Sequence, residues 1–183
     1  MSCSMFTHRS SHTAMAHNGC GALGFVAARV WLVLQVGQIV DALFELCRSG
    51  QVFTDEGDFS ARASEHIATH YAYGEGATIL FKPTLAAEDQ FRETTEEALS
   101  YFVGTEGTED GGFAIAPYTA VRWENNGTVI SDSGDMAVAM GNYFFTGTDG
   151  NETKVEYSFA YEKDDNGDLK IVLHHSSLPF SAN

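Results

Sequence analysis

The feature that most constrains the fold is a series of strand-like segments after Gly112, interrupted by short polar turns. The segments are rich in β-branched and aromatic residues and read FAIAPYTAVRWE, TVISDS, DMAVAMGNYFFT, TKVEYSFAYEK and LKIVLHHSSL. Residues that accept the positive φ values of hairpin turns separate them, at 125–127, 149–151 and 165–167. Strands joined by hairpins pair with their neighbours, so the sequence predicts an antiparallel meander.

The chain before these strands is predicted to hold three helices. Apolar residues at helical spacing predict helices over 38–48 and 59–72, and Ser60 is the candidate N-cap of the second. The third helix is expected to be capped by Thr94 or the threonine that follows it, and to end at Gly104.

A short buried strand is predicted over 77–82, and Pro83 ends it because proline lacks a backbone N–H. The order of helices, short strand, helix and hairpin-linked sheet predicts an α+β fold with helices on one face of a curved antiparallel sheet. Helices across the mouth of such a sheet close a conical cavity. Concave sites with apolar walls and a few polar groups bind small ligands.

The chain is strongly acidic, with 25 Asp and Glu residues against 10 Lys and Arg residues and a formal net charge of -15. This field repels phosphate backbones and anionic lipid headgroups, so nucleic-acid and membrane-surface binding are disfavoured. The length of 183 residues, 44% of them hydrophobic, suits one domain with a substantial core.

The first forty residues differ in composition from the rest, because no acidic residue precedes Asp41. Residues 1–19 are small and hydroxylated, and residues 21–36 form an apolar run broken by Arg29 and Gln35. This pattern is typical of a targeting peptide.

We therefore predict a leader over 1–37, cleaved or disordered, and a single domain over 38–183. A membrane anchor and a first helix that folds with the domain are the alternatives, and Arg29 argues against the anchor. A leader would direct the protein to an organelle such as the chloroplast, or to the periplasm or secretory route; without one the protein would be cytoplasmic. Only Cys47 lies in the predicted domain, so no disulfide is expected within it.

The last predicted strand ends in four consecutive polar residues. Side chains alternate between the two faces of a strand, so His174 pairs with Ser176 on one face and His175 with Ser177 on the other. Strict alternation also places Val172 on the face of His174. These residues alone leave open which face lines a cavity, and exposure at a strand end would explain both pairs equally well.

Four spaced motifs, FKPT, ALSYFVG, KVEYSFAYEK and KIVLHHSSLP, resemble the iota-class carbonic anhydrases. That class belongs to the calcium/calmodulin-dependent protein kinase II association-domain group of the nuclear transport factor 2-like (SnoaL-like) superfamily. The match runs from Gln38 to Pro179. It implies a cone-shaped barrel, in which a curved antiparallel sheet wraps around N-terminal helices, and a homodimer formed through the sheet. It also implies a lyase that interconverts CO2 and bicarbonate.

The same resemblance implies which residues carry the reaction. By motif matching, the residues expected to line the bicarbonate pocket are Thr84, Tyr101, His174 and Ser176. This choice makes the even-numbered face of the last strand concave and leaves His175 and Ser177 as secondary candidates. The hydroxyls would hold bicarbonate and orient water, and His174 would move the proton, because an unperturbed imidazole titrates near neutral pH.

The motifs point to a metal-free mode and disfavour manganese or zinc as a cofactor. The chain has no CxxC or HExxH motif, and the two adjacent histidines of the last strand diverge to opposite faces. His66 and His70 stand one helical turn apart with Glu65 nearby, but no third ligand is identifiable.

Two other functions stay open at this point. The domain could be a non-catalytic association module, or an isomerase or dehydratase that uses a buried carboxylate as its base. The nearest carboxylates are Asp135 and Glu156, and both could equally face water. The aromatic stripe of Tyr157, Phe159 and Tyr161 is assigned to the packed face of the sheet.

Overall fold

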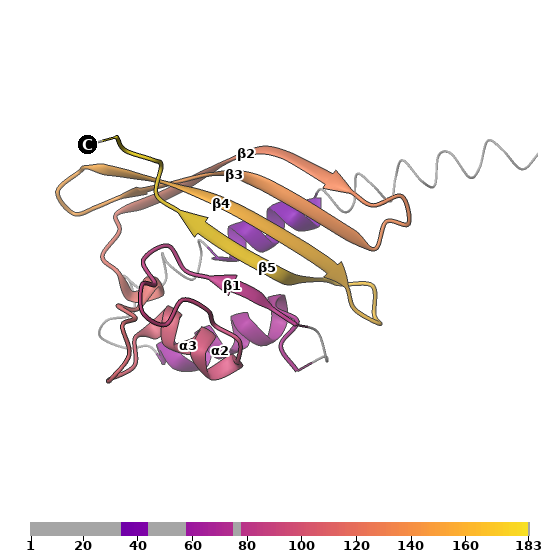
Figure 1. The fold of residues 1–183 in the computed structure, drawn as a ribbon, viewed down its shortest axis with the longest axis horizontal. Helices are drawn as coiled ribbons and strands as arrows, with labels where there is room; N and C mark the ends of the chain where they lie inside the picture. The colour runs from indigo at the N-terminus through magenta and orange to yellow at the C-terminus, as the bar shows by residue number, and fades with distance from the viewer. Residues whose placement is uncertain (1–33, 44–57, 75–77, 183) are drawn as a thin grey trace, which may run out of the picture.

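The computed structural model describes residues 34–43, 58–74 and 78–182, and in them helices lie on one face of a five-stranded sheet (Figure 1). The elements are a helical segment at 34–43, α2 (Phe59–His70), β1 (Leu80–Lys82), α3 (Thr95–Val103), the 3-10 helix η1 (Phe113–Ile115), β2 (Ala120–Ile130), β3 (Met136–Thr146), β4 (Glu152–Lys163) and β5 (Leu169–Ser177). The predicted α+β class is confirmed. Most of the predicted leader lies outside the described residues, so the leader stays a prediction.

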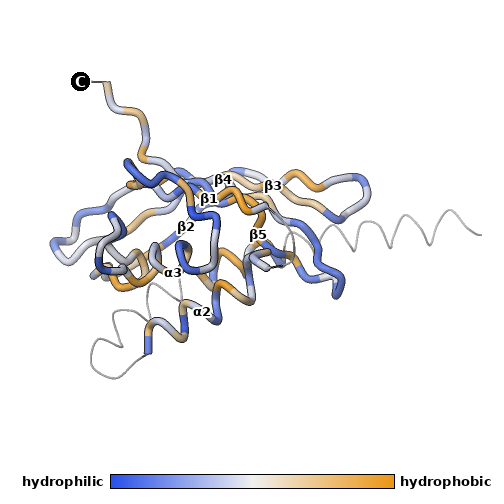
Figure 2. The backbone as a smooth tube through the Cα atoms, turned by 60° about the horizontal axis from the view of Figure 1, so that its bottom comes forward, coloured by the Kyte–Doolittle hydropathy of each residue, from blue (hydrophilic) through white to orange (hydrophobic). Residues whose placement is uncertain are grey.

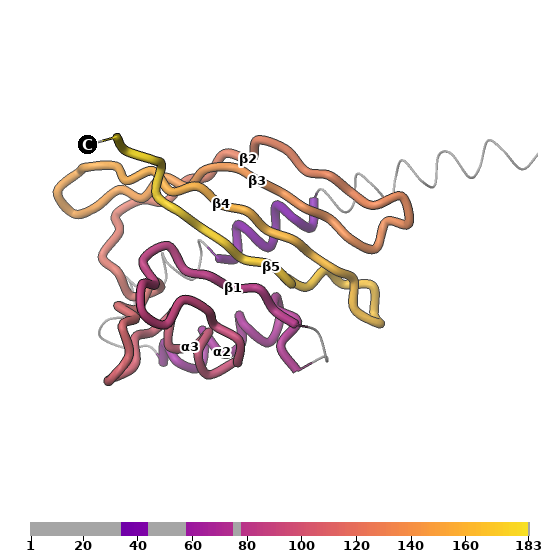
Figure 3. The backbone as a smooth tube through the Cα atoms, viewed as in Figure 1, coloured from indigo at the N-terminus to yellow at the C-terminus, as the bar shows by residue number. Residues whose placement is uncertain are grey.

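The strand order is β1-β5-β4-β3-β2, and the four long strands form the predicted antiparallel meander. The sheet is mixed rather than wholly antiparallel, because β1 adds to the edge of β5 in the parallel direction. Figure 3 shows the last strand, β5, running between β1 and β4. The C-terminal half of β5 therefore lies beside β1. This pairing brings together residues about ninety positions apart in the chain.

The predicted turn at 125–127 is wrong, because β2 is one continuous strand there. Its pairing with β3 shifts register between Asn125 and Gly127, which marks a β-bulge, a common role of glycine inside a strand. The chain turns only after β2, where the N–H of Gly134 donates to the carbonyl of Ser131. The predicted strand before β2 is also partly wrong, since it begins as the 3-10 helix η1.

The helix ends follow the predicted capping chemistry with one change. Asp58, and not Ser60, caps α2 by accepting a hydrogen bond from the N–H of Ala61. Helix α3 has the predicted cap, since Thr94 and Glu97 form a reciprocal capping box. Of the helix predicted over 38–48, the described part is helical and residues 44–48 lie outside it.

The core lies between the helices and the inner face of the sheet. Tyr157, Phe159 and Tyr161 are buried there, which confirms their predicted packing role. The helical segment 34–43 adds buried aliphatic side chains, and the indole of Trp123 donates to its Asp41 carboxylate. Figure 2 shows hydrophobic and hydrophilic stretches alternating along α2, as expected of a helix with one buried face. None of the helices in the described part is long and apolar enough to cross a bilayer.

Candidate active site

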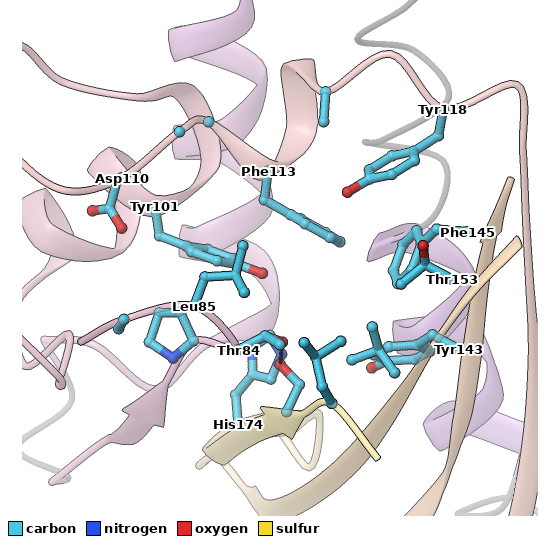
Figure 4. A pocket seen from close by; sticks show the side chains of 18 of the residues that line it. Thr84, Leu85, Tyr101, Asp110, Phe113, Tyr118, Tyr143, Phe145, Thr153 and His174 are labelled. Carbon is cyan, nitrogen blue, oxygen red and sulfur yellow. Dashed lines mark hydrogen bonds between the residues drawn. The ribbon is translucent and has the colours of Figure 1, made fainter. Parts of the chain in front are cut away.

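A cavity of about 480 Å³ opens between the inner face of the sheet and the loops that flank α3. Its walls are mostly aromatic and aliphatic, which is typical of small-molecule sites. Figure 4 shows labelled side chains around it, from the loop after β1, from α3, from η1 and from the sheet. The four predicted site residues all line this cavity: Thr84, Tyr101, His174 and Ser176.

A β-bulge in β5 turns the last histidine and serine toward the cavity. Ile171 pairs with Tyr161, but the next residue of β4, Ala160, pairs with Leu173, so Val172 is an extra residue in the ladder. Residues 169 and 171 are buried before the bulge, and residues 174 and 176 are buried after it. The predicted strict alternation through Val172 is therefore wrong, because the extra residue exchanges the two faces of the strand.

His174 is enclosed by aromatic rings. Its imidazole stacks on Phe81 with centroids 4.4 Å apart and lies against Phe159 at 4.5 Å. Its Nδ1 lies 2.8 Å from the hydroxyl of Tyr71, at the end of α2. Tyr71 therefore occupies one ring nitrogen and leaves Nε2 for a ligand in the cavity.

Burial keeps this imidazole neutral. The pKa of His174 is lowered to about 3, first by desolvation and then by His66 and His175. The expectation of an unperturbed imidazole is therefore not met. A neutral ring has one donor and one acceptor nitrogen, so Nε2 accepts from a ligand when Nδ1 donates to Tyr71, and donates in the other tautomer.

Two hydroxyls from distant parts of the chain meet at the same wall. The Oγ1 of Thr84 donates to the Oγ of Ser176 at 2.8 Å, across 92 positions of sequence. Thr84 is placed by β1, which ends at Lys82 directly before Pro83, and Ser176 is placed by β5. The parallel pairing of these strands thus assembles the pair.

Tyr101 reaches the cavity from α3. Its ring stacks on Phe113 at 5.3 Å and meets Phe81 edge to face at 5.0 Å. It also stands perpendicular to His174, with centroids 6.4 Å apart. These contacts hold Tyr101 beside the imidazole, as Figure 4 shows.

The secondary candidates lie on the other face of β5. His175 is exposed, and Ser177 lies 3.4 Å from the carboxylate of Glu156 on that face. Neither His175 nor Ser177 lines the cavity. The structure thus separates the two His/Ser pairs as alternation after the bulge requires.

In the candidate metal pair, His66 is buried against Phe102 of α3 and His70 is half-buried. The rings of His66 and His70 lie 4.8 Å apart, while Glu65 is exposed. Burial, followed by the neighbouring His70, lowers the pKa of His66 to about 3. Across residues 34–43, 58–74 and 78–182, no three His, Cys, Asp or Glu side chains are grouped to hold an ion.

The carboxylates considered for an isomerase lie away from the cavity. Asp135 is exposed in the turn after β2 and accepts hydrogen bonds from Ser131 and Ser133. Glu156 is exposed on the outer face of β4. Neither is placed to act as a base on a bound ligand.

Sequence reasoning missed Tyr71 and the aromatic rings that enclose the imidazole. Nothing in the local sequence marks Tyr71, because its contact with His174 spans 103 positions. Tyr143 and Phe145 also line the cavity, and their spacing of two on β3 was an available signal.

The chain resembles known proteins in sequence. Residues 40–178 match the model of the family described as metal-independent carbonic anhydrase. A metal-independent carbonic anhydrase from Nostoc sp. is 40% identical over 129 residues, covering 68% of this chain and 62% of the relative. The chain therefore spans less than two thirds of that relative's length.

One solved structure extends the similarity to the fold, and a second is more distant. The crystal structure of an iota-carbonic anhydrase from a cyanobacterium, complexed with bicarbonate, has a TM-score of 0.71 at 33% identity and covers 82% of this chain and 92% of that chain. A nuclear transport factor 2-like superfamily protein from Salmonella enterica has a TM-score of 0.47 at 13% identity, with coverage of 83% and 96%.

Proposed function

The chain belongs to the family of metal-independent carbonic anhydrases, and from this membership we propose that it interconverts CO2 and bicarbonate in the cavity beside His174. The observation that carries the proposal is the meeting of a hydroxyl pair and an imidazole at one wall of an apolar cavity. The hydroxyls are those of Thr84 and Ser176, and the imidazole is that of His174, whose partner Tyr71 does not itself line the cavity. An apolar wall suits CO2, and hydroxyls beside an imidazole suit water and bicarbonate.

The proposed hydration step uses His174 as the proton acceptor. The oxygen of a bound water forms a bond to the carbon of CO2, and one water proton moves to Nε2 of His174, which leaves bicarbonate. This requires the tautomer in which Nδ1–H donates to the Tyr71 hydroxyl. A pKa of about 3 makes the imidazole a weak base, but the anion that forms beside it favours the protonated ring. Solvent then takes the proton.

The hydroxyls are proposed to hold the anion and its water. Ser176 accepts from Thr84, so its own proton is directed elsewhere and can be donated to a bicarbonate oxygen. Tyr101 is proposed to contact the same ligand from α3. In this scheme no metal is needed, in keeping with the family described as metal-independent.

Stopped-flow CO2 hydration by the purified chain tests the proposal. We expect activity that a chelator leaves unchanged and that His174→Gln lowers at least tenfold, in the range of general acid–base contributions. Activity lost on chelation would contradict the metal-free mode. An inactive parent chain would instead favour the association module.

We also propose that two copies pair through the outer face of the sheet. That face exposes Val129 (74%), Val138 (43%) and Met140 (57%). Val129 pairs with Val138, and Val138 pairs with Ala160 on β4, so the residues form one apolar patch across three strands. An exposed patch of this kind favours a protein partner, and a second copy presents the same surface.

A further inference from the structure

Two loops that line the cavity are joined by a buried ion pair. The guanidinium of Arg92 is 2% exposed, and the carboxylate of Asp110 is 6% exposed. Nη2 donates to Oδ1 at 2.6 Å and Nε donates to Oδ2 at 3.1 Å, a bidentate geometry. The pair connects the loop that carries Thr84 with the glycine-rich loop after α3.

The guanidinium is held in place by contacts beyond its carboxylate. Nη1 donates to the carbonyls of Asp89 and Phe91, at 2.6 and 3.1 Å. The backbone N–H of Arg92 donates to the carbonyl of Phe81 on β1, and its own carbonyl accepts from the Tyr73 hydroxyl. Arg92 is therefore anchored to the strand that positions Thr84.

The carboxylate of the neighbouring Glu109 is held by backbone hydrogen bonds rather than by a bidentate ion pair. Its carboxylate accepts the backbone N–H groups of Ala87, Glu88 and Asp89, at 3.0, 3.2 and 2.9 Å. These bonds, with that from Ala87 first, lower the pKa of Glu109. Glu109 and Asp110 of this loop thus both have partners from the opposite loop.

The charge of Asp110 matters because Asp110, like the neighbouring Glu109, lines the cavity and Arg92 does not. Figure 4 shows Asp110 on the same side of the cavity as Tyr101. An uncompensated carboxylate there would repel an anionic ligand, in a chain whose formal net charge is already -15. The bidentate pair cancels that charge within the wall.

We propose that the Arg92–Asp110 pair determines the anion affinity of the cavity, with Arg92 as a positioning residue that neutralises Asp110 at the wall. The proposal rests on the proposed function, since bicarbonate is the anion concerned. The proposal predicts an effect on bicarbonate but not on CO2, because CO2 carries no charge and bicarbonate does.

Variants that remove the charge of one partner at a time test this proposal. We expect Arg92→Gln to raise the KM for bicarbonate about tenfold and Asp110→Asn to lower it about threefold, because the remaining charge repels or attracts the anion at a distance of several ångströms. Arg92→Gln with Asp110→Asn should restore a KM within about twofold of the parent, and the KM for CO2 should change less than twofold in all three variants.

If the Arg92–Asp110 pair only stabilises the packing of the two loops, a different pattern is expected. Loss of packing would weaken bicarbonate binding in all three variants, and that result would overturn the proposal. Arg92→Lys keeps the charge but loses the bidentate bonds, so it should stay close to the parent in KM. If Arg92→Gln does not fold, Asp110→Asn decides alone, because tighter binding supports the charge account and weaker binding refutes it.

Arg122→Gln is the matched control for net charge. Arg122 lies on the outer face, half exposed, pairs with Glu124 and Glu152, and stacks over Phe144. Its loss should leave the KM for bicarbonate unchanged, and a shift equal to that of Arg92→Gln would overturn the proposal.

Binding is measured separately from activity, as the rise in melting temperature with potassium bicarbonate against equal potassium chloride. One outcome is an inactive parent, with Asp110→Asn binding bicarbonate more tightly than the parent and Arg92→Gln more weakly. That result would support the role of the Arg92–Asp110 pair and refute the proposed function. An active parent whose variants lack that order would refute the proposal alone. A parent that neither binds bicarbonate nor turns over would refute both.

Discussion

The hydroxyl of Tyr71 lies 2.8 Å from Nδ1 of His174, although 103 positions separate the two residues. Tyr71 comes directly after α2 and forms a bridge with Ile171, one residue before the bulge in β5. The helix end and the bulged strand are thus joined at the point where the imidazole turns inward. This bond selects the ring nitrogen that faces the cavity.

Tyr71→Phe should lower kcat for CO2 hydration at least tenfold while changing KM little, because the imidazole loses the partner that orients its tautomer. Stopped-flow kinetics at several CO2 concentrations measures both constants. The control is Tyr161→Phe, since the buried Tyr161 hydroxyl has no hydrogen-bond partner among the described residues and lies outside the cavity. Equal activity in the two variants would contradict the role given to Tyr71.

Thr84→Val and Ser176→Ala should each lower kcat/KM by roughly tenfold to a hundredfold, because each removes one member of the hydrogen-bonded pair. The double variant should be no more than about threefold worse than the poorer single variant, since the two hydroxyls act as one unit. Ser177→Ala, on the outer face one residue away, should keep full activity. Additive losses in the double variant would show that the hydroxyls act independently.

The stability of the fold should fall as the pH drops below 6.5. The folded state holds His66 and His174 with pKa values of about 3, while the unfolded chain protonates them near 6.5. Between these values the unfolded state binds more protons, so the free energy of unfolding decreases by up to about 1.4 kcal/mol per pH unit for each histidine. The full contribution is present above pH 6.5.

Urea unfolding at pH 7.5, 6.5, 5.5 and 5.0 measures this slope. His66→Leu should reduce the slope by less than half, because His174 and the half-buried His70, whose pKa burial also lowers, remain while the carboxylates are unchanged. Parallel curves for the parent and the variant would show that His66 is not buried in its neutral form.

Val138→Lys should convert the expected dimer to a monomer, because it places a charge at the centre of the outer apolar patch. Light scattering after size-exclusion chromatography measures the molar mass. Phe180→Lys is the control, since Phe180 is 93% exposed in the segment after β5 and lies outside the sheet. A parent that runs as a monomer would refute the pairing of two copies.

Local signals predicted most of the individual elements. The Thr94–Glu97 capping box and the hairpin turns at 149–151 and 165–167 follow from side-chain chemistry within a few residues. The turn at 125–127 failed because the same residues also suit a β-bulge, and pairing with β3 decided between the two. A turn signal cannot show whether a partner strand continues alongside it.

By itself the sequence determined the α+β class, the meander, the acidic character and, through its resemblance to a family, the four candidate site residues. Only the tertiary structure decided how these residues meet. The bulge at Val172 sets which face of β5 carries His174 inward, and the parallel pairing of β1 with β5 brings Thr84 to Ser176. The bulge depends on pairing with the neighbouring strand β4, whereas the pairing of β1 with β5 joins segments about ninety positions apart. Local residue spacing predicts neither, because both are decided by contacts between strands.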